Sequence, residues 1–233
     1  MKIALIGYGA MGKLIGTSAK NKNHEIAVVI DEADANLSAK RLAQKLKGVD
    51  AAIDFSTAEA VRKNVEACLI AGVPLVEGST GWNGEKKVIK NLIEEKNGAF
   101  VFGANFSIGV NLFYKITDYA SELFSKFEDY EAFIEEQHHS RKKDAPSGTA
   151  LKLKEIVAKN IEKDFSVSST RAGNIPGTHR VGFDGNADQI LLEHFARSRE
   201  GFASGALLAA EWIVGKKGFW EFTEVIDEIM QKK

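Results

Sequence analysis

The stretch KIALIGYGAMGKLIGTSAKN, residues 2–21, decides the fold of the first half of the chain. Ile3–Ile6 form a continuous apolar run that predicts a buried strand, and residues 10–21 follow with a helical pattern. Between them, Gly7, Gly9 and Gly12 fit the pattern G-x-G-x-x-G. A strand, a glycine turn and a helix in this order predict the first unit of a doubly wound α/β sheet.

The same turn predicts dinucleotide binding. Its glycines permit a tight turn, a close approach of a pyrophosphate to the backbone, and close packing of helix on strand. The phosphates would lie at the helix N-terminus, where backbone amides are unpaired. A structural turn without a ligand is the alternative. The candidate cofactor contacts in the turn are Gly7, Tyr8, Gly9, Ala10, Met11 and Gly12.

Asp31 ends a second apolar run, EIAVVID, at the distance from the glycines that suits an adenosine ribose. The neighbouring Glu32 would repel a 2′-phosphate, which favours NADH over NADPH. Lys13, just after the last glycine, could partly compensate. The sequence therefore leaves both cofactors open, with NADH favoured.

Three more strand-like runs, residues 51–56, 73–80 and 98–107, alternate with helical patterns and extend the parallel sheet to residue 107. Each run ends in a turn of small or polar residues: Asp54–Ser56, Gly78–Gly81 and Ala104–Ser107. Ligands of open α/β sheets bind outside the carboxyl ends of strands. We therefore expect these turns to offer room and backbone amides to a flat ring and its carboxamide.

The pattern changes after residue 107 and predicts a second domain of α+β type, about 108–203. Its first helix carries a predicted core-facing stripe of Leu112, Ile116, Tyr119 and Leu123. Strand-like runs surround Asp184–Gly185, a turn signal typical of antiparallel pairing, so we expect a mixed or antiparallel sheet in this domain. The tail after residue 203 is helical and, from the sequence alone, could pack on either domain.

The stretch EQHHSRKKDAPSGTA, residues 136–150, concentrates titratable and cationic side chains. Strand alternation places Tyr130, Ala132, Ile134 and His138 on one side and His139 on the other, and the strand should end near His138. The following loop carries Lys142, and Pro146–Thr149 opens a helix whose first amides lack partners. Lys142 and those amides predict a site for an anion such as a carboxylate, while a histidine can exchange a proton near neutral pH.

Composition narrows the classes of function. The formal net charge is −1, so no global field favours nucleic acid or a membrane surface. Cys68 is the single cysteine and lies in an apolar helical pattern, which excludes a zinc site built from cysteines. The cations near His138 oppose binding of a metal ion there, so we expect no metal site. Without a signal-peptide pattern or an apolar run of roughly 18 residues, we expect a cytoplasmic protein.

The chain resembles the dihydrodipicolinate reductase family. The long motif EQHHSRKKDAPSGTAL carries the resemblance, and GYGAMG, DFS, EGSTG, ANFSIGVN, TRAG and SREGFASGA match in the same order along the whole chain. The resemblance implies hydride transfer from NADH or NADPH to a cyclic, unsaturated dicarboxylate, giving tetrahydrodipicolinate in the diaminopimelate route to lysine. It does not decide whether the substrate is the dihydro or the hydroxy-tetrahydro form.

The resemblance also assigns roles by motif position. His138 would be the general acid/base and Lys142 its cationic partner or proton donor, with His139, Gly148 and Thr149 contacting the substrate. Further cofactor contacts would be Asp31, Gly78, Ser79, Thr80, Gly103, Ala104, Asn105 and Phe106. It further implies a homotetramer built through the second sheet. The tail would return to the nucleotide domain, giving a dinucleotide-binding domain of residues 1–107 with 204–233, and a substrate-binding and oligomerisation domain of residues 108–203.

Some positions depart from the family pattern. Glu32 stands where many members have a basic residue, Glu77 replaces a commonly apolar residue, and Ser79 replaces a common threonine. Two rival interpretations stay open: an amino-acid dehydrogenase of similar plan, and a dinucleotide-binding redox sensor without turnover. One hypothesis follows from the cation run beside His138: like charges should lower its pKa, and a dianionic substrate should raise it again.

Overall fold

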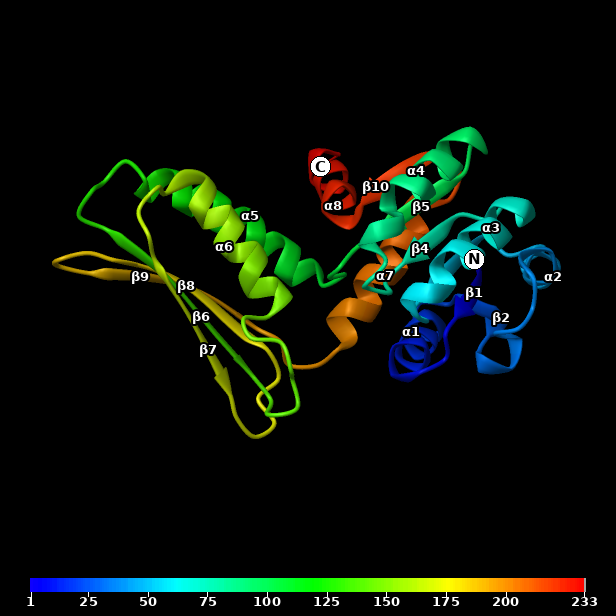
Figure 1. Cartoon of the computed structure of the whole chain (residues 1–233), viewed down its shortest axis with the longest axis horizontal. Helices are drawn as coiled ribbons and strands as arrows, with labels where there is room; N and C mark the ends of the chain where they lie inside the picture. Colours follow the sequence, from blue (N-terminus) through cyan, green and yellow to red (C-terminus); the bar gives the residue numbers. More distant parts are fainter. Residues whose placement is uncertain (233) are drawn as a thin grey trace. The chain divides into compact units, whose positions relative to one another are not determined.

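A computed structural model describes residues 1–232 of the chain and divides them into two compact units. Unit 1 comprises residues 1–108 with the tail from Arg199, and unit 2 comprises Gly109–Ser198. Each unit has its own sheet (Figure 1). Among the described residues, unit 1 has two hydrophobic clusters and unit 2 has one. No helix within residues 1–232 has the length and apolar character needed to span a membrane.

Unit 1 is built on a six-stranded sheet in which every pair of neighbouring strands is parallel. Its order is β10-β5-β4-β3-β1-β2. The strands are β1 (Lys2–Ile6), β2 (Glu25–Ile30), β3 (Ala51–Asp54), β4 (Leu75–Glu77), β5 (Ala99–Phe102) and β10 (Gly218–Glu221). The predicted doubly wound parallel sheet is confirmed, and the tail adds an edge strand, β10, that sequence patterning did not predict.

Helices cover both faces of this sheet. They are α1 (Ala10–Asn21), α2 (Ala39–Lys45), α3 (Val61–Ala71), α4 (Lys86–Glu95), α7 (Glu200–Ile213) and α8 (Phe222–Gln231), with short 3₁₀ turns at Glu32–Asp34, Ala58–Ala60 and Asn83–Glu85. One core joins Ile3 and Leu5 to α1, α7 and α8, and the other joins Ala4 and Ile6 to α2, α3 and α4. Alternate side chains of β1 thus contribute to the two cores, because successive side chains of a strand point to opposite faces of the sheet.

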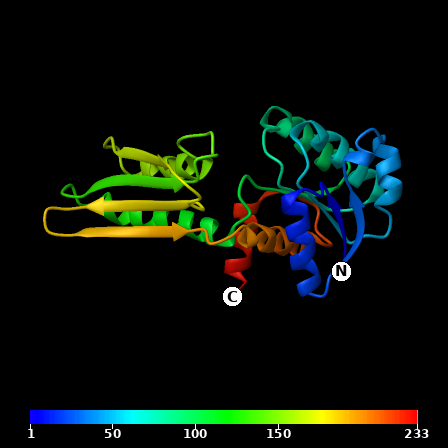
Figure 2. The ribbon, with the colours of Figure 1, turned by 90° about the horizontal axis from the view of Figure 1, so that it is seen from below.

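Unit 2 is a four-stranded mixed sheet, ordered β7-β6-β8-β9, with two helices on one face. The elements are α5 (Ile108–Phe124), β6 (Glu131–His138), α6 (Gly148–Asn160), β7 (Ser166–Arg171), β8 (Thr178–Asp184) and β9 (Gln189–Phe195). Strand β6 runs parallel to β7 and antiparallel to β8, and β8 pairs antiparallel with β9. The predicted second α+β fold with a mixed or antiparallel sheet is confirmed (Figure 2).

The core of unit 2 packs α5 and α6 against the inward side chains of β6 and β8. Ala132 pairs with Phe183, Ile134 pairs with Val181, and all four side chains belong to one cluster. The predicted stripe of α5 is wrong, because Leu112, Ile116, Tyr119 and Leu123 are all exposed. The helix instead buries the opposite side, which includes Val110, Phe113, Tyr114, Thr117 and Ser121.

Candidate active site

The glycine turn of unit 1 lies between β1 and α1. Gly7 has φ of 83°, and a Cβ added there would lie 2.4 Å from the carbonyl oxygen of Phe55. A Cβ on Gly12 would lie 2.1 Å from the carbonyl oxygen of Gly7. A Cβ on Gly9, the N-cap of α1, would meet no protein atom within 4 Å. Two glycines therefore close the turn, while the third keeps open space beside the unpaired amides of α1, as a pyrophosphate requires.

Asp31 follows β2 directly and is exposed. One of its carboxylate oxygens accepts a hydrogen bond from the amide of Ala33, 3.1 Å away, and so caps a short 3₁₀ turn. The amide of Gly7 donates to the carbonyl of Ile30, 2.8 Å away, which brings the glycine turn beside the end of β2. The carboxylate thus lies on the same sheet edge as the glycines, within a turn that fixes its direction.

The turns after β3, β4 and β5 are linked by extensions of the sheet's hydrogen bonds. Phe55 donates to Ile6, Gly78 donates to Asp54, and Gly103 donates to Glu77. The predicted cofactor residues Gly78, Ser79, Thr80, Gly103, Ala104 and Asn105 therefore gather at one edge of unit 1. Phe106 differs from them: the residue is 2% exposed, its ring packs on Phe55 and Phe222, and its carbonyl oxygen would lie 1.7 Å from a Cβ added to Gly205.

Two carboxyl groups are fully buried beneath these turns. Asp54 ends β3, Glu77 ends β4, and their side chains share a hydrogen bond. Burial raises the pKa of Asp54, although hydrogen bonds from Ser56 and Asn64 partly offset it. Burial and then the neighbouring Asp54 raise the pKa of Glu77 well above its usual range. The pair therefore keeps a proton that exposed carboxyls release, and Glu77 also accepts from the amide of Ser79 at 2.6 Å.

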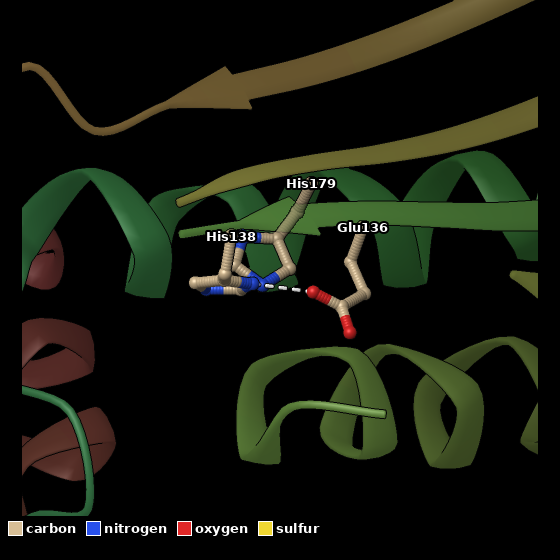
Figure 3. A group of neighbouring side chains, drawn as sticks. All are labelled: Glu136, His138 and His179. Carbon is tan, nitrogen blue, oxygen red and sulfur yellow. Dashed lines mark hydrogen bonds and ion pairs between the residues drawn. The ribbon is translucent and has the colours of Figure 1, made fainter. Parts of the chain in front are cut away.

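In unit 2, strand alternation directs Glu136 and His138 to the inward face of β6, the same face as Ala132 and Ile134. His179 lies opposite Glu136 on the antiparallel neighbour β8. Figure 3 shows the three side chains together on the side of the sheet that carries α6. The rings of His138 and His179 are 5.1 Å apart and nearly perpendicular, and the Nδ1 atom of His138 is hydrogen-bonded to the carboxylate of Glu136.

Glu136 is an ionised carboxylate although it is 1% exposed. Burial alone would raise its pKa, but hydrogen bonds led by Arg171 outweigh burial and lower the pKa to about 2. The guanidinium of Arg171 donates to both oxygens, at 2.6 and 3.0 Å. The amide of Ser147 adds a third donor at 3.2 Å. A bidentate arginine of this kind holds both the charge and the orientation of a carboxylate.

Burial also lowers the pKa of His138; Lys142 and Arg171 act in the same direction, and Glu136 opposes them. The predicted direction is confirmed, but its main cause is burial rather than the cation run. Arg141, one of those cations, instead hydrogen-bonds Asn174 at 2.9 Å. Burial lowers the pKa of His179 to about 4, so this second imidazole is neutral near pH 7.

The predicted anion site lies in the loop after β6 and at the start of α6. The ammonium of Lys142 pairs with Asp144 at 2.8 Å. Ser147 caps α6, since its hydroxyl accepts from the amide of Ala150 at 3.2 Å, and it also contacts Nε2 of His179 at 3.0 Å. Gly148 is exposed with open space where a Cβ would stand, and Thr149 is half-buried beside it. Among these residues of unit 2, Lys142 lies close enough to lower the pKa of His138, and Ser147 contacts both Glu136 and His179. The candidate cofactor residues belong to unit 1.

His139 follows the end of β6 and is half-buried. Its Nδ1 atom is buried and makes no hydrogen bond to any residue in the range 1–232. A polar ligand atom could therefore supply a partner there, since buried polar groups are normally hydrogen-bonded.

Glu136, His138 and His179 also offer atoms within 4.8 Å of one another, a spacing that a metal ion could use. Their chemistry argues against it. Arg171 already occupies both oxygens of Glu136, and Lys142 adds positive charge nearby. A cation placed there would have to displace a bidentate guanidinium, so the group is better described as a hydrogen-bonded network.

Sequence reasoning missed three members of this network: Glu136, Arg171 and His179. Strand alternation carried a signal for Glu136, since it lies two residues before His138 on the same face. No local signal placed Arg171 or His179 beside it, because they come from β7 and β8. Their motifs TRAG and GTH lie more than 30 residues further along the chain.

The parallel sheet of unit 1 and its glycine turn are those of a nicotinamide-dependent oxidoreductase. Comparison with known proteins gives the family. The profile described as "Dihydrodipicolinate reductase, N-terminus" matches residues 1–106, and "Dihydrodipicolinate reductase, C-terminus" matches residues 109–226. The chain belongs to the dihydrodipicolinate reductase family, as its motifs predicted.

Individual relatives agree. The chain is 35% identical to the 4-hydroxy-tetrahydrodipicolinate reductase of Christiangramia forsetii, over 99% of this chain and 100% of the relative. It is 36% identical to the enzyme of the same name from Archaeoglobus fulgidus, over 97% and 100%. A dipicolinate-bound dihydrodipicolinate reductase from Paenisporosarcina sp. TG-14 shares the fold, with a TM-score of 0.80, 24% identity, and coverage of 97% of this chain and 99% of that one.

Proposed function

We propose that the chain catalyses the NAD(P)H-dependent reduction of 4-hydroxy-tetrahydrodipicolinate to tetrahydrodipicolinate, in the diaminopimelate route to lysine. The observation that carries the proposal is the arrangement in unit 2: His138 ends β6 close to the cation Lys142 and the capped N-terminus of α6. This arrangement occurs in a chain that shares its whole length with relatives named for that activity.

Unit 1 (residues 1–108 and the tail from Arg199) would hold the cofactor. When bound, the nicotinamide supplies a hydride. The pyrophosphate would lie against the amides of α1, in the space that Gly9 leaves open, and Asp31 would accept hydrogen bonds from the ribose. The turns of residues 78–80 and 103–106 would contact the nicotinamide. Because Asp31 and Glu32 are both exposed acids, NADH is the cofactor that we favour over NADPH.

Unit 2 would hold the dicarboxylate. The amides at Gly148 and Thr149 lie in the first turn of α6, where the helix dipole favours an anion, and Gly148 leaves space for a carboxylate to approach. Lys142 would pair with the substrate, which would then compete with Asp144 for the ammonium. His139 would donate or accept at its unpartnered Nδ1 atom.

His138 would deliver the proton. Hydride addition leaves negative charge on the ring of the substrate, and a nearby acid with fixed cations stabilises that charge where it develops. Because burial lowers the pKa of His138, the free protein holds it mainly neutral near pH 7. A dianionic substrate beside Lys142 would raise this pKa, so the acid would form when substrate binds.

The direct test is oxidation of NADH and NADPH by the purified protein, supplied with the product of dihydrodipicolinate synthase. His138→Gln should lower kcat strongly and leave the affinity for NADH nearly unchanged. His24→Gln, which changes a histidine of unit 1 outside the proposed site, is the matched control. Equal losses of turnover and NADH affinity would mean that His138 has a structural role only.

The proposed acid also makes a prediction for pH profiles. The pKa on the acidic limb of kcat, which reports the complex, should lie above that of kcat/KM, which reports the free protein. An acidic-limb pKa that stays constant or falls on binding would contradict the proposed coupling.

Two glycine variants test the cofactor site. Gly9→Ala adds a methyl group to open space, so it should leave the stability of unit 1 unchanged while weakening NADH binding. Gly12→Ala places a methyl group against the backbone of Gly7, so it should reduce both the stability of unit 1 and the affinity for NADH. The expected cost in stability from overpacking is about 1–3 kcal/mol. If Gly9→Ala bound NADH as tightly as the unmodified chain, the pyrophosphate would lie elsewhere.

We also propose a homotetramer built through the sheet of unit 2. Both helices of unit 2 pack on one face of this sheet, and its edge strand β9 exposes Ile190, Leu191 and Phe195. Apolar side chains on an exposed edge are typical of a surface that another copy covers. Analytical ultracentrifugation of the unmodified chain and of Leu191→Glu would test this, with a smaller species expected for the variant.

A further inference from the structure

Glu136 is the most buried charged group of unit 2, and no catalytic or substrate role has been assigned to it above. It is 1% exposed, and both of its oxygens are occupied. One oxygen accepts from Arg171 and the amide of Ser147, and the other accepts from Arg171 and contacts Nδ1 of His138. The side chain of Ser169 adds a further hydrogen bond. A buried carboxylate held by several donor groups has a fixed orientation as well as a fixed charge.

This orientation decides which nitrogen of His138 carries the proton. The carboxylate of Glu136 stays ionised and can only accept, so Nδ1 of His138 must donate to it. In the neutral imidazole, Nε2 is then the nitrogen without a proton. Nε2 lies beside Gly177, where an added Cβ would be 3.2 Å away, so the glycine keeps that atom clear of a side chain.

We propose that Glu136, held by Arg171, is a positioning residue that fixes His138 in the tautomer whose Nε2 atom gains and delivers the proton. The proposal rests on the proposed reduction, because it assigns the exchangeable proton of that reaction to one atom. Arg171 is essential to this proposal. It pairs with His138 in the register of β6 and β7, and its guanidinium donates hydrogen bonds to both oxygens of Glu136.

The other charged and titratable groups around His138 fit this role. His179 on β8 is neutral near pH 7 because burial lowers its pKa to about 4, so it does not compete for the carboxylate as a cation. Lys142 lies in the following loop and pairs with Asp144 rather than with Glu136. The carboxylate of Glu136 is thus shared by Arg171, the side chain of Ser169, the amide of Ser147 and His138.

The tautomer can be measured without substrate. Two-bond ¹⁵N–¹H correlation spectra of the ¹⁵N-histidine-labelled chain distinguish a proton on Nδ1 from one on Nε2, and the signal missing from His138→Gln assigns the ring. We expect the Nδ1–H form for His138 in the unmodified chain at pH 8. An Nε2–H form there would overturn the proposal; the tautomer is measured in the unmodified chain, and His138→Gln serves only to assign the signal.

Glu136→Gln should reverse the tautomer. Arg171 requires an oxygen acceptor, so the new carboxamide would turn its oxygen to the guanidinium and its NH₂ group to Nδ1 of His138. We expect the Nε2–H form in this variant, kcat reduced by at least about 100-fold, and a KM for NADH within about twofold of the unmodified value. Loss of turnover with an unchanged Nδ1–H tautomer would show that Glu136 serves the fold alone, and would overturn the proposal.

Glu135→Gln is the matched control. Glu135 is the neighbouring glutamate on the same strand, but it points to the other face, where it pairs with Arg180 at 3.6 Å. Its replacement should leave both the tautomer and kcat unchanged; equal effects of the two variants would contradict a specific role for Glu136. If the unmodified chain oxidises no NADH with the dicarboxylate, the proposed function fails, whereas the tautomer measurements still decide how His138 is held.

Discussion

Replacing Glu77 with glutamine should stabilise unit 1 against unfolding, by an amount that grows with pH. Glu77 is fully buried beside Asp54, and burial together with that neighbouring carboxyl raises its pKa well above the usual value of 4.5. In the unfolded chain the same side chain is in water and releases its proton near that value. At a pH between these two pKa values, folding therefore has to return a proton to Glu77.

The magnitude follows from linkage. Because the pKa of Glu77 is raised in the folded state, its contribution to the unfolding free energy is fully present below pH 4.5. This contribution is lost as the pH rises towards the folded-state pKa. One extra bound proton in the folded state changes the unfolding free energy by about 1.4 kcal/mol per pH unit in that window. Glutamine keeps an oxygen for the amide of Ser79 and offers an NH₂ group to Asp54, so it resembles the protonated acid without the penalty.

The three tryptophans make the assay specific, because Trp82, Trp212 and Trp220 all belong to unit 1. Urea unfolding followed by tryptophan fluorescence, without cofactor, should show nearly equal stabilities near pH 4.5. The advantage of Glu77→Gln should then grow by about 1.4 kcal/mol per pH unit, or roughly 3–5 °C in Tm, until the folded pKa is passed.

The control is Glu95→Gln, which changes an exposed carboxylate at the end of α4 in the same unit. It should show no growing difference from the unmodified chain. A constant difference between Glu77→Gln and the unmodified chain from pH 5 to 8, or a less stable variant at pH 7, would refute the reasoning that the pair holds a proton.

Three further predictions concern stability and reactivity. Phe183→Ala, at a side chain that is 0% exposed, should destabilise unit 2 by about 3–5 kcal/mol in urea unfolding followed by far-UV circular dichroism, and Ile190→Ala on the exposed edge by far less. Arg171→Gln should cost about 3–5 kcal/mol at pH 7, because it leaves Glu136 buried without its partner. Since Arg171 lowers the pKa of Glu136 to about 2, the unmodified chain should lose this stability as pH falls from 4.5 through 2, and the variant should not. The pKa of the Cys68 thiol is raised mainly by burial and further by Asp54 and Glu77. Because the thiolate is the reactive form, Cys68 should react with iodoacetamide at pH 8 only after unfolding.

The first unit could be predicted well because its signals are local. The strand, glycine turn and helix of residues 2–21 lie next to one another in the chain, and each requires residue types that the sequence shows directly. The end of β6 at His138 and the cap of α6 at Ser147 were readable for the same reason. Edge strand β10 was missed because no local pattern distinguished it from the helical tail; it exists by pairing with β5.

The face of α5 shows where local patterning fails. Apolar residues occur on more than one side of this helix, so periodicity offered two stripes and could not choose between them. The sheet made the choice, burying Phe113 and Tyr114 against β6 and β8 and leaving Ile116 and Tyr119 exposed. Buried polar residues on the same side, Thr117 and Ser121, made the correct stripe look less apolar than the wrong one.

The sequence by itself determined the elements, the glycine turn, the position of His138 at a strand end and the family, because each depends on residues close together in the chain. Only the tertiary structure decided which charges meet. Glu136 acquires Arg171 from β7, and Asp54 acquires Glu77 from β4, each across one strand spacing. Strand pairing sets such contacts independently of distance along the sequence, and the contacts then decide the charge states. Hydrogen bonds led by Arg171 keep Glu136 ionised against the effect of burial, whereas burial and the neighbouring Asp54 raise the pKa of Glu77.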